Sequence, residues 1–566
     1  MVSLFNALNI SSNALTVNES AISVVSHNVA NMNTEGYSKQ RVNLATRNIS
    51  GAIGDSTEAQ VRANGGVMIA NIMRHNDSYL NNYYRDQLST LKGLEAQLEG
   101  LGDLANIFND LEGEGISGAL SEFYKAVNNL QEYPASATAR TNFIETAKTL
   151  TMALNSTSSQ LSELTSKALG DGETQDLLEG SKIYNEYSVF NKKLEELAEV
   201  NKALQITQTG TLHANNLLDQ RDMILNDIAQ FVDINIEENP HNGSVDLYIG
   251  NTAMVKGAEV HGQLELVTAK AYCEDPEVGL AYPADWYVKN EEGDPILDEF
   301  GNKQPREAAV INIVRYDNDG NREVIMHDAN STITGGSLGG LLHSTDVEAE
   351  GMNPGVAQAA LDSIAQGLAS LFNTINTQDG AYCINSERTN ELKVSGKDNF
   401  IFGEPKEVYD DAGNLIGYEL GEVSASSISL NSKLLEQDGI WNIACAFSKD
   451  PNYLDENLNA VGNAQNVVQM LETRNKKMAE LGNMSLEDYY TNLVGKVAAS
   501  GSSAQALVDT QSEVVDSIYD KILSNNSVDL NEELVDLVKY QTAYSAAAQV
   551  FNTCNSCLNT LMTLGG

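Results

Sequence analysis

Cysteine, proline and basic residues are scarce in this chain of 566 residues. The five cysteines are Cys273, Cys383, Cys445, Cys554 and Cys557, an odd and sparse set that argues against a disulfide framework. Lysine and arginine number 35 against 78 acidic residues, which gives a formal net charge of −43. Because nucleic acid and anionic membranes both require clustered cations, we expect neither as a partner.

Motifs for catalysis and metal binding are also missing. The seven histidines are scattered, and neither His-Glu-x-x-His nor Gly-x-Ser-x-Gly occurs. Cys554-x-x-Cys557 is a single pair, which we interpret as two small core residues rather than a zinc site. The glycine-rich run 335–342 lacks the Gly-Lys-Ser/Thr of a phosphate loop, and 317–321 lacks the spacing of an EF-hand. We therefore expect no catalytic residue, cofactor or metal, and no enzyme activity.

Signals for membrane insertion are absent as well. Residues 1–6 contain no basic region and no continuous apolar run, so we expect no cleaved Sec-type signal peptide. No stretch is long enough to span a membrane. The expectation is a cytosolic chain, or one exported by a route that does not cut a signal.

A heptad pattern fills the last part of the chain, from Asp529 to Leu564. Its ten positions follow an unbroken 4,3 spacing: Leu530, Leu534, Leu537, Gln541, Tyr544, Ala548, Phe551, Asn555, Leu558 and Met562. A second apolar seam, from Ala543 to Leu564, is interleaved with the first. A helix with two apolar stripes requires partners on two sides. Asp529 with Glu532 three residues later is typical of a capping box at the start of this helix.

The first thirty residues show the same spacing at Leu4, Leu8, Ser11, Leu15, Asn18, Ile22, Val25 and Val29. The polar face of this helix is mostly serine and asparagine, which are mediocre helix formers. Such a helix is marginal alone and stable when packed. We expect both ends of the chain to pair in one coiled-coil unit, with the rest inserted between them.

Short motifs accompany both terminal helices. Asn31, Asn33, Thr34, Gly36 and Tyr37 form the pattern Asn-x-Asn-Thr-x-Gly-Tyr after the first helix. This pattern resembles the N-terminal motif of the bacterial flagellar axial proteins, the family of rod, hook and hook-associated proteins. Residues 528–533, followed by Tyr-Gln-x-x-Tyr at 540–544, are similar to the C-terminal motif of the same family.

Three internal stretches resemble the hook-associated members of that family. They are Phe123-Tyr124-x-Ala126 with Gln131, Pro134 and Arg140; Ala214 to Asp222; and the glycine-rich run 335–342. Hook and rod proteins do not carry the Leu-Leu-Asp-Gln-Arg-Asp of the second stretch. We interpret its acidic and basic residues as a salt-bridged contact between helices.

The expected fold is mainly α with inserted β domains. Helical patterns are expected at 77–104, 121–132, 137–169, 184–204, 217–231, 356–375, 457–470, 486–490 and 504–523. Strands are expected at 245–249, 255–267, 286–288, 308–316, 322–327, 400–402 and 428–430, with a turn at 411–414. The predicted domains are a terminal coiled coil (1–60 with 525–566), a helical bundle (61–233 with 334–380 and 438–524), a β-rich insertion (234–333) and a second β-rich segment (381–437).

The resemblance implies a structural protein of the bacterial flagellum that joins hook to filament. It implies self-assembly into a ring or helical layer through the terminal helices. The implied partners are the hook protein, hook-associated protein 3 and a flagellar export chaperone. It also implies type III export without a cleaved signal, and a final place outside the cell. The alternatives are a hook or distal-rod protein, or a secreted adhesin or glycan-binding protein built on the β insertion.

Overall fold

The computed structural model describes residues 2–48, 64–109, 115–170, 180–268, 309–316, 320–345, 351–386, 388–409, 415–421, 423–449 and 460–564. The strand expected at 286–288 and the turn expected at 411–414 lie outside the described residues, as does most of 317–321.

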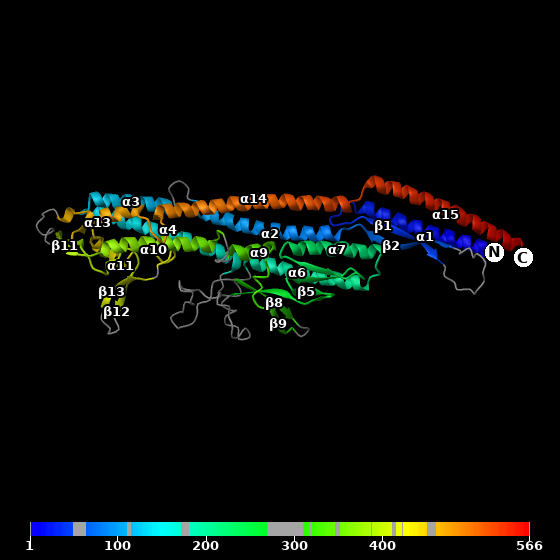
Figure 1. The fold of residues 1–566 in the computed structure, drawn as a ribbon, viewed down its shortest axis with the longest axis horizontal. Coiled ribbons are helices and arrows are strands. Elements are labelled where there is room, and N and C mark those ends of the chain that lie inside the picture. The colour runs from blue at the N-terminus through cyan, green and yellow to red at the C-terminus, as the bar shows by residue number, and fades with distance from the viewer. Residues whose placement is uncertain are drawn as a thin grey trace.

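The chain forms a long rod whose helices run along its length, with both termini at one end (Figure 1). The long helices are α1 (Val2–Ala30), α2 (Ser78–Ile107), α3 (Gly115–Glu132), α4 (Ala137–Leu169), α6 (Lys182–Ile206), α7 (Leu212–Ala229), α10 (Pro354–Thr377), α14 (Leu486–Asn526) and α15 (Leu530–Leu564). Shorter helices are α9 (Gly336–Thr345), α11 (Ser432–Leu435) and α13 (Gln465–Glu472). No described helix is both long enough and apolar enough to cross a membrane.

Small antiparallel sheets are attached to this rod, several of them along one side (Figure 1). The strands are β1 (Gln40–Asn48), β2 (Asn64–Arg74), β3 (Asn235–Glu238), β4 (Val245–Ile249), β5 (Thr252–Lys256), β6 (Glu259–Val260), β7 (Gln263–Thr268), β8 (Ala309–Tyr316), β9 (Arg322–Met326), β10 (Ala381–Asn385), β11 (Arg388–Val394), β12 (Pro405–Tyr409), β13 (Leu415–Leu420) and β14 (Ala446–Phe447). They form the sheets β1-β2, β3-β4-β5-β6, β7-β8-β9, β11-β10-β14 and β12-β13. The expectation of a mainly helical chain with β insertions is confirmed.

Two large buried clusters hold the body together. One joins α3, α4, α10 and the first part of α14, and its centre is a group of aromatic rings from Phe123, Phe143, Phe372 and Phe402. The other packs α6, α7 and α9 against the sheets formed by β3 to β9. Neither cluster includes a residue of α1 or α15. The body therefore has its own hydrophobic core, separate from the terminal helices.

Some local expectations were wrong. Residues 486–526 form one continuous helix, although the sequence predicts two, because packing of its buried residues at both ends (Leu486 to Val497, and Val515 with Ile518) outweighs the low helix propensity of Gly495 and Gly501. Phe400–Phe402 makes only a single bridge, from Phe402 to Leu430, because its side chains fill the core between helices. The expected strand 255–267 is divided into three short strands by turns.

The glycine-rich run lets α9 approach α2 closely. A Cβ on Gly340 would lie 2.3 Å from the carbonyl oxygen of Gly93 and 2.9 Å from Cβ of Ala96. A Cβ on Gly336 would lie 2.1 Å from the carbonyl carbon of Phe231, and its φ of +69° is in the left-handed region. This run therefore serves helix packing rather than phosphate binding.

We expect Gly340→Ala to destabilise the body by about 1–3 kcal/mol, because its new methyl group meets fixed backbone. The matched control is Gly495→Ala in α14, where no atom lies within 4 Å of the new Cβ. That control is expected to be neutral or to stabilise by up to about 1 kcal/mol. Thermal unfolding of the two variants measures the difference, and equal melting temperatures would contradict the packing argument.

Candidate assembly site

The terminal helices α1 and α15 lie side by side at one end of the rod (Figure 1). On α15 the buried and half-buried residues Glu533, Leu537, Tyr540, Ala547, Phe551, Cys554 and Leu558, together with the exposed Tyr544, follow a 4,3,4,3 spacing. This stripe takes every second position of the predicted first seam and adds residues of the second. The α1-facing surface of α15 therefore lies between the two seams that the sequence shows.

The predicted residues of α1 are mostly half-buried. Leu4, Leu8, Leu15, Ile22 and Val29 are intermediate in exposure. Val25 is buried, together with Ala21 and with Val17 and Val24, two residues that the sequence reasoning did not select. These extra residues are buried because α1 packs against β2 as well as against α15.

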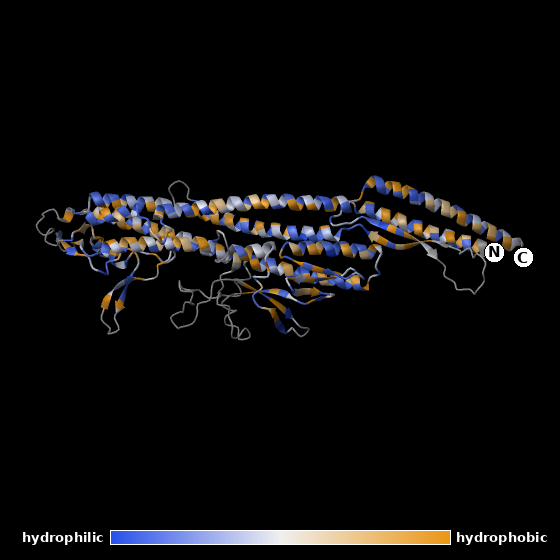
Figure 2. Ribbon diagram, viewed as in Figure 1, coloured by the Kyte–Doolittle hydropathy of each residue, from blue (hydrophilic) through white to orange (hydrophobic). Residues whose placement is uncertain are grey.

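The other side of α15 exposes apolar residues to solvent. On one flank Leu534 and Met562 are 46% and 75% exposed, and on the opposite flank Val550 is about half exposed. Leu530 and Leu561, at the two ends of the stripe that faces α1, are 40% and 49% exposed. Figure 2 shows apolar residues along α15 far from the body. Of the predicted α15 interface residues, Leu537, Ala548, Phe551 and Leu558 are half-buried and the others are exposed.

A buried hydrogen-bond network lies at the base of the two helices, centred on Asn28. The Asn28 amide donates to the carbonyl of Gln40 at 2.8 Å and to a carboxylate oxygen of Glu533 at 3.0 Å. Its carbonyl oxygen accepts from the Tyr37 hydroxyl at 2.7 Å and from the Gln40 N–H at 3.0 Å. One side chain of α1 thus joins the family motif, β1 and α15.

The motif residues shape this network. Gly36 has φ of +74°, which favours glycine, and the turn it makes brings Tyr37 back toward Asn28. The Asn31 amide donates to the His27 carbonyl at 2.9 Å, and so helps to end α1. Burial, reinforced by Asp219 and Glu533, raises the pKa of the Tyr37 hydroxyl, which therefore keeps its proton and donates. Thr34 and Asn33 are exposed.

Ion pairs fix the start of α15 to β1. Lys39 Nζ lies 2.5 Å from a carboxylate oxygen of Glu532 and 3.2 Å from one of Glu533, and Arg41 also pairs with Glu532. The backbone N–H of Lys39 donates to the carbonyl of Asn526, the last residue of α14. Asp529 caps α15 as expected, but the Glu532 side chain binds these two cations instead of completing the capping box.

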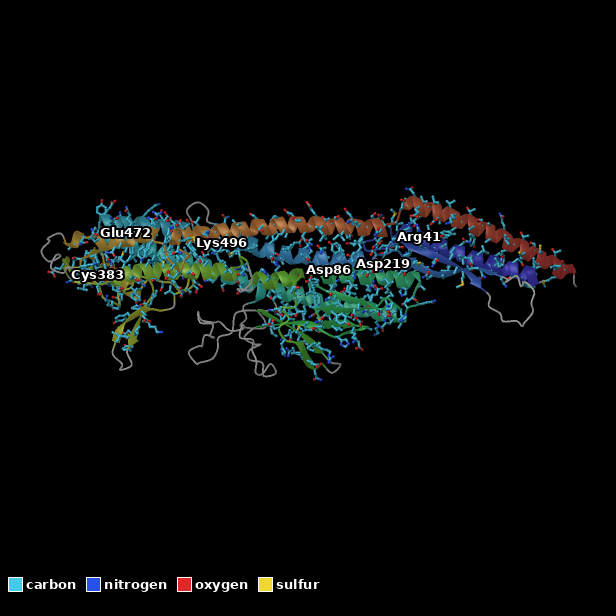
Figure 3. The ribbon with its side chains drawn as sticks, viewed as in Figure 1. Arg41, Asp86, Asp219, Cys383, Glu472 and Lys496 are labelled. Atoms are coloured by element: carbon cyan, nitrogen blue, oxygen red, sulfur yellow. The ribbon has the colours of Figure 1, made fainter. Side chains whose placement is uncertain are left out.

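A second ionic cluster fixes the motif loop to the body. Asp219 and Asp222 of α7 bind Arg74 at the end of β2 at 2.9 and 2.7 Å. Asp222 also contacts Arg85 of α2 at 3.3 Å and Arg221 at 2.8 Å. Burial disfavours the charged form of Asp222, but the three arginines outweigh this effect and hold its pKa well below the usual carboxylate range. Figure 3 shows Asp219 and Arg41 near the place where the terminal helices meet the body.

At Asp219 the effect of burial on the pKa exceeds the effect of its partners. Burial raises its pKa, although Arg74 and the N–H of Ser38, 3.3 Å away, act in the lowering direction. The salt-bridged contact expected for Asp219–Asp222 is present in the structure, and its partners are a strand and a helix. Sequence reasoning did not select Asn28, Lys39 or Glu533; the signal that marks Asn28 and Glu533 is a polar residue on an otherwise apolar helix face.

The described part of the chain contains no group of three or more His, Cys, Asp or Glu side chains that could hold a metal ion. What the arrangement offers is a mechanical joint. Two terminal helices with exposed apolar flanks are attached to a separately folded body through buried polar and ionic contacts.

Sequence comparisons relate this arrangement of terminal helices to a class of proteins. Residues 8–37 match the family described as flagella basal body rod protein, and residues 521–564 match the flagellar basal body rod FlgEFG protein C-terminal family. These two segments include most of α1, the motif that follows it, and all of α15. The paired terminal helices are therefore similar to those of axial proteins of the bacterial flagellum.

Within that class the similarity is to flagellar hook-associated protein 1. Residues 101–292 match the flagellar hook-associated protein FlgK helical domain. The chain is 23% identical to flagellar hook-associated protein 1 of Bacillus subtilis (strain 168), over 97% of this chain and 96% of the relative. It is 22% identical to the protein of the same name from Salmonella typhimurium, over 98% and 99%. The resemblance inferred from the motifs is confirmed.

A solved structure has the same fold. The flagellar hook junction protein FlgK from Burkholderia pseudomallei matches with a TM-score of 0.52 and 14% identity. The match covers 79% of this chain and 100% of that chain. It supports the mainly helical architecture with β insertions.

Proposed function

We infer that the chain is a structural component of the bacterial flagellum that forms the junction between hook and filament. The observation that carries this function is similarity to hook-associated protein 1 over nearly the full length of the chain. The match of residues 101–292 to the helical domain of a hook-associated protein favours this function over that of a hook or rod protein.

Gold-labelled antibody against the body, applied to isolated flagella, tests this function. We expect one band of label between hook and filament. Label along the whole hook would support the alternative hook protein, and label along the filament surface would support a secreted adhesin. Binding of a glycan array by the purified chain would support the adhesin alternative further.

We propose that the terminal helices carry the self-assembly. The pairing of α1 with α15 covers one side of α15, while Leu534 and Met562 on one flank and Val550 on the other stay exposed. Exposed apolar stripes of this length mark an interaction surface. Contacts between different surfaces of neighbouring copies build a ring or helical layer rather than a closed dimer. The division into a terminal unit, a helical bundle and two β-rich segments remains part of this proposal.

The individual binding partners that we propose follow from this place in the flagellum. We propose contacts with the hook protein on one side and with hook-associated protein 3 on the other. A cytoplasmic chaperone covering the apolar flanks of α15 would keep the chain soluble before export. Type III export without a cleaved signal, a final place outside the cell and the lack of enzyme activity complete the proposal.

Two native cysteines of α15 provide a probe of self-assembly. Cys557 is exposed on the flank that contains Val550, whereas Cys554 is only 8% exposed, on the side facing α1. In the free monomer we expect a maleimide to label Cys557 at least about tenfold faster than Cys554, because reaction requires access to the thiolate. In intact flagella we expect Cys557 to be protected as well. Site-resolved mass spectrometry measures both rates, and an equally reactive Cys557 in flagella would contradict the contact.

A further inference from the structure

Two cysteines far from the terminal helices occupy neighbouring strands of one sheet. Cys383 lies in β10, and Cys445 immediately precedes β14. Figure 3 shows Cys383 near the end of the rod opposite the termini. β10 and β14 are antiparallel, and Tyr382 is opposite Ala446. The next step of this register places Cys383 opposite Cys445.

The hydrogen bonds define what kind of pair this is. The N–H of Ser448 donates to the carbonyl of Gly380 at 2.9 Å, which marks a hydrogen-bonded position. Such positions alternate along an antiparallel pair, so the position of Cys383 and Cys445 is a non-hydrogen-bonded one. Opposite Cα atoms there lie about 4.5 Å apart. A disulfide spans Cα separations of about 4.4–6.8 Å, so this position accepts one.

The surroundings of the two sulfur atoms are polar but shielded from solvent. Cys383 and Cys445 are 0% and 2% exposed. Cys383 donates its S–H to the carbonyl of Asn442 at 3.1 Å, and Arg140 Nη2 donates to the sulfur of Cys445 at 3.0 Å. Burial raises the pKa of both thiols, that of Cys445 to about 11, so neither is reactive in the folded chain.

We propose that Cys383 and Cys445 form a disulfide as the chain folds. The oxidant is a low-molecular-weight disulfide, for which oxidised glutathione serves as the probe. The thiolate of one cysteine attacks a glutathione sulfur and releases one glutathione thiolate. The thiolate of the other cysteine then attacks the mixed disulfide and releases the second. The two protons lost by the cysteines end on the two reduced glutathiones, and the cysteines lose the two electrons that glutathione gains.

This bond would fix a segment that holds a buried cation. Arg140 is fully buried, and its guanidinium donates to the carbonyls of Ile440 and Ile443 as well as to Cys445. A link from Cys445 to β10 holds these acceptors in place. Disulfides persist outside the cell, where the proposed function places the chain, but the test does not depend on that location.

The test refolds the full-length chain from denaturant in a buffer of oxidised and reduced glutathione. Free thiols are then counted in denaturant, and cross-linked tryptic peptides are mapped without reduction. We expect three thiols per chain instead of five, and a link between the peptides Glu323–Arg388 and Leu434–Lys449. A matched control, Cys557→Ala, keeps this link.

Two further variants and one measurement complete the test. Cys383→Ala and Cys445→Ala each abolish the linked pair and leave four free thiols. Far-ultraviolet circular dichroism establishes that each sample has refolded. Five free thiols in the refolded wild-type chain, or a link that joins other cysteines, would overturn the proposal.

Discussion

Ala547→Pro is expected to abolish incorporation of the chain into flagella while the body stays folded. Ala547 lies in the middle of α15, on the half-buried stripe that faces α1. A proline there removes a helical hydrogen bond and clashes with the preceding turn, at a cost of about 3 kcal/mol or more. α1 is a marginal helix that is stable only when packed, so it also loses its stabilisation when α15 breaks. Deletion of residues 530–566 is expected to have the same result.

The body has two buried clusters that contain no residue of α1 or α15, so its unfolding transition is expected to remain. Ala547→Ser serves as the matched control, since it keeps the backbone N–H and is expected to assemble. Complementation of a deletion strain, with microscopy of its flagella, measures incorporation, and circular dichroism measures folding. A proline variant that still occupies the hook tip would show that α15 has another task.

Asp222→Asn is expected to destabilise the body by about 3–5 kcal/mol at neutral pH, because it leaves buried arginines without their shared carboxylate. Asp520→Asn on the exposed face of α14 serves as the control, with an expected change within about 0.5 kcal/mol. Urea unfolding followed by circular dichroism gives both values. A loss below about 1 kcal/mol for Asp222→Asn would contradict the importance of this cluster.

The pH dependence of this effect has a definite sign. The pKa of Asp222 is lower in the folded chain than in the unfolded chain. Its contribution to the free energy of unfolding is therefore complete above the unfolded pKa of about 4, and is lost as the pH falls through the folded pKa. We expect the difference between wild type and Asp222→Asn to shrink below about pH 4. A difference that stays constant from pH 6 to pH 2.5 would contradict this assignment.

The helices could be predicted because apolar residues with a helical period are a local signal. The helix expected at 137–169 agrees with α4 at both ends, where Ser136 caps its start and Gly170 follows its end. The prediction was less successful where tertiary contacts decide. Phe402 belongs to an apolar run typical of a strand, but packing against Phe123 and Phe372 holds it in the core between helices.

The candidate site was predicted in outline and missed in detail. The heptads indicate that both termini are helices that need partners, and the structure brings the two together. Which side of α15 faces α1 could not be read from the sequence, because both interleaved seams satisfy a period of 3.5. That choice depends on long-range polar contacts, such as those of Asn28 and Lys39 with Glu533. These residues are separated by about 500 positions, so no local pattern connects them.

Deletion of the gene, with electron microscopy of the cells and an assay of the culture medium, tests the junction function most directly. Cells that keep their hooks, lack filaments and release unpolymerised flagellin would agree with a chain that joins hook to filament. Restoration of filaments by the intact gene, but not by the gene for Ala547→Pro, would assign this task to the terminal helices. Loss of the hooks themselves would contradict the account and identify the chain as a hook or distal-rod protein.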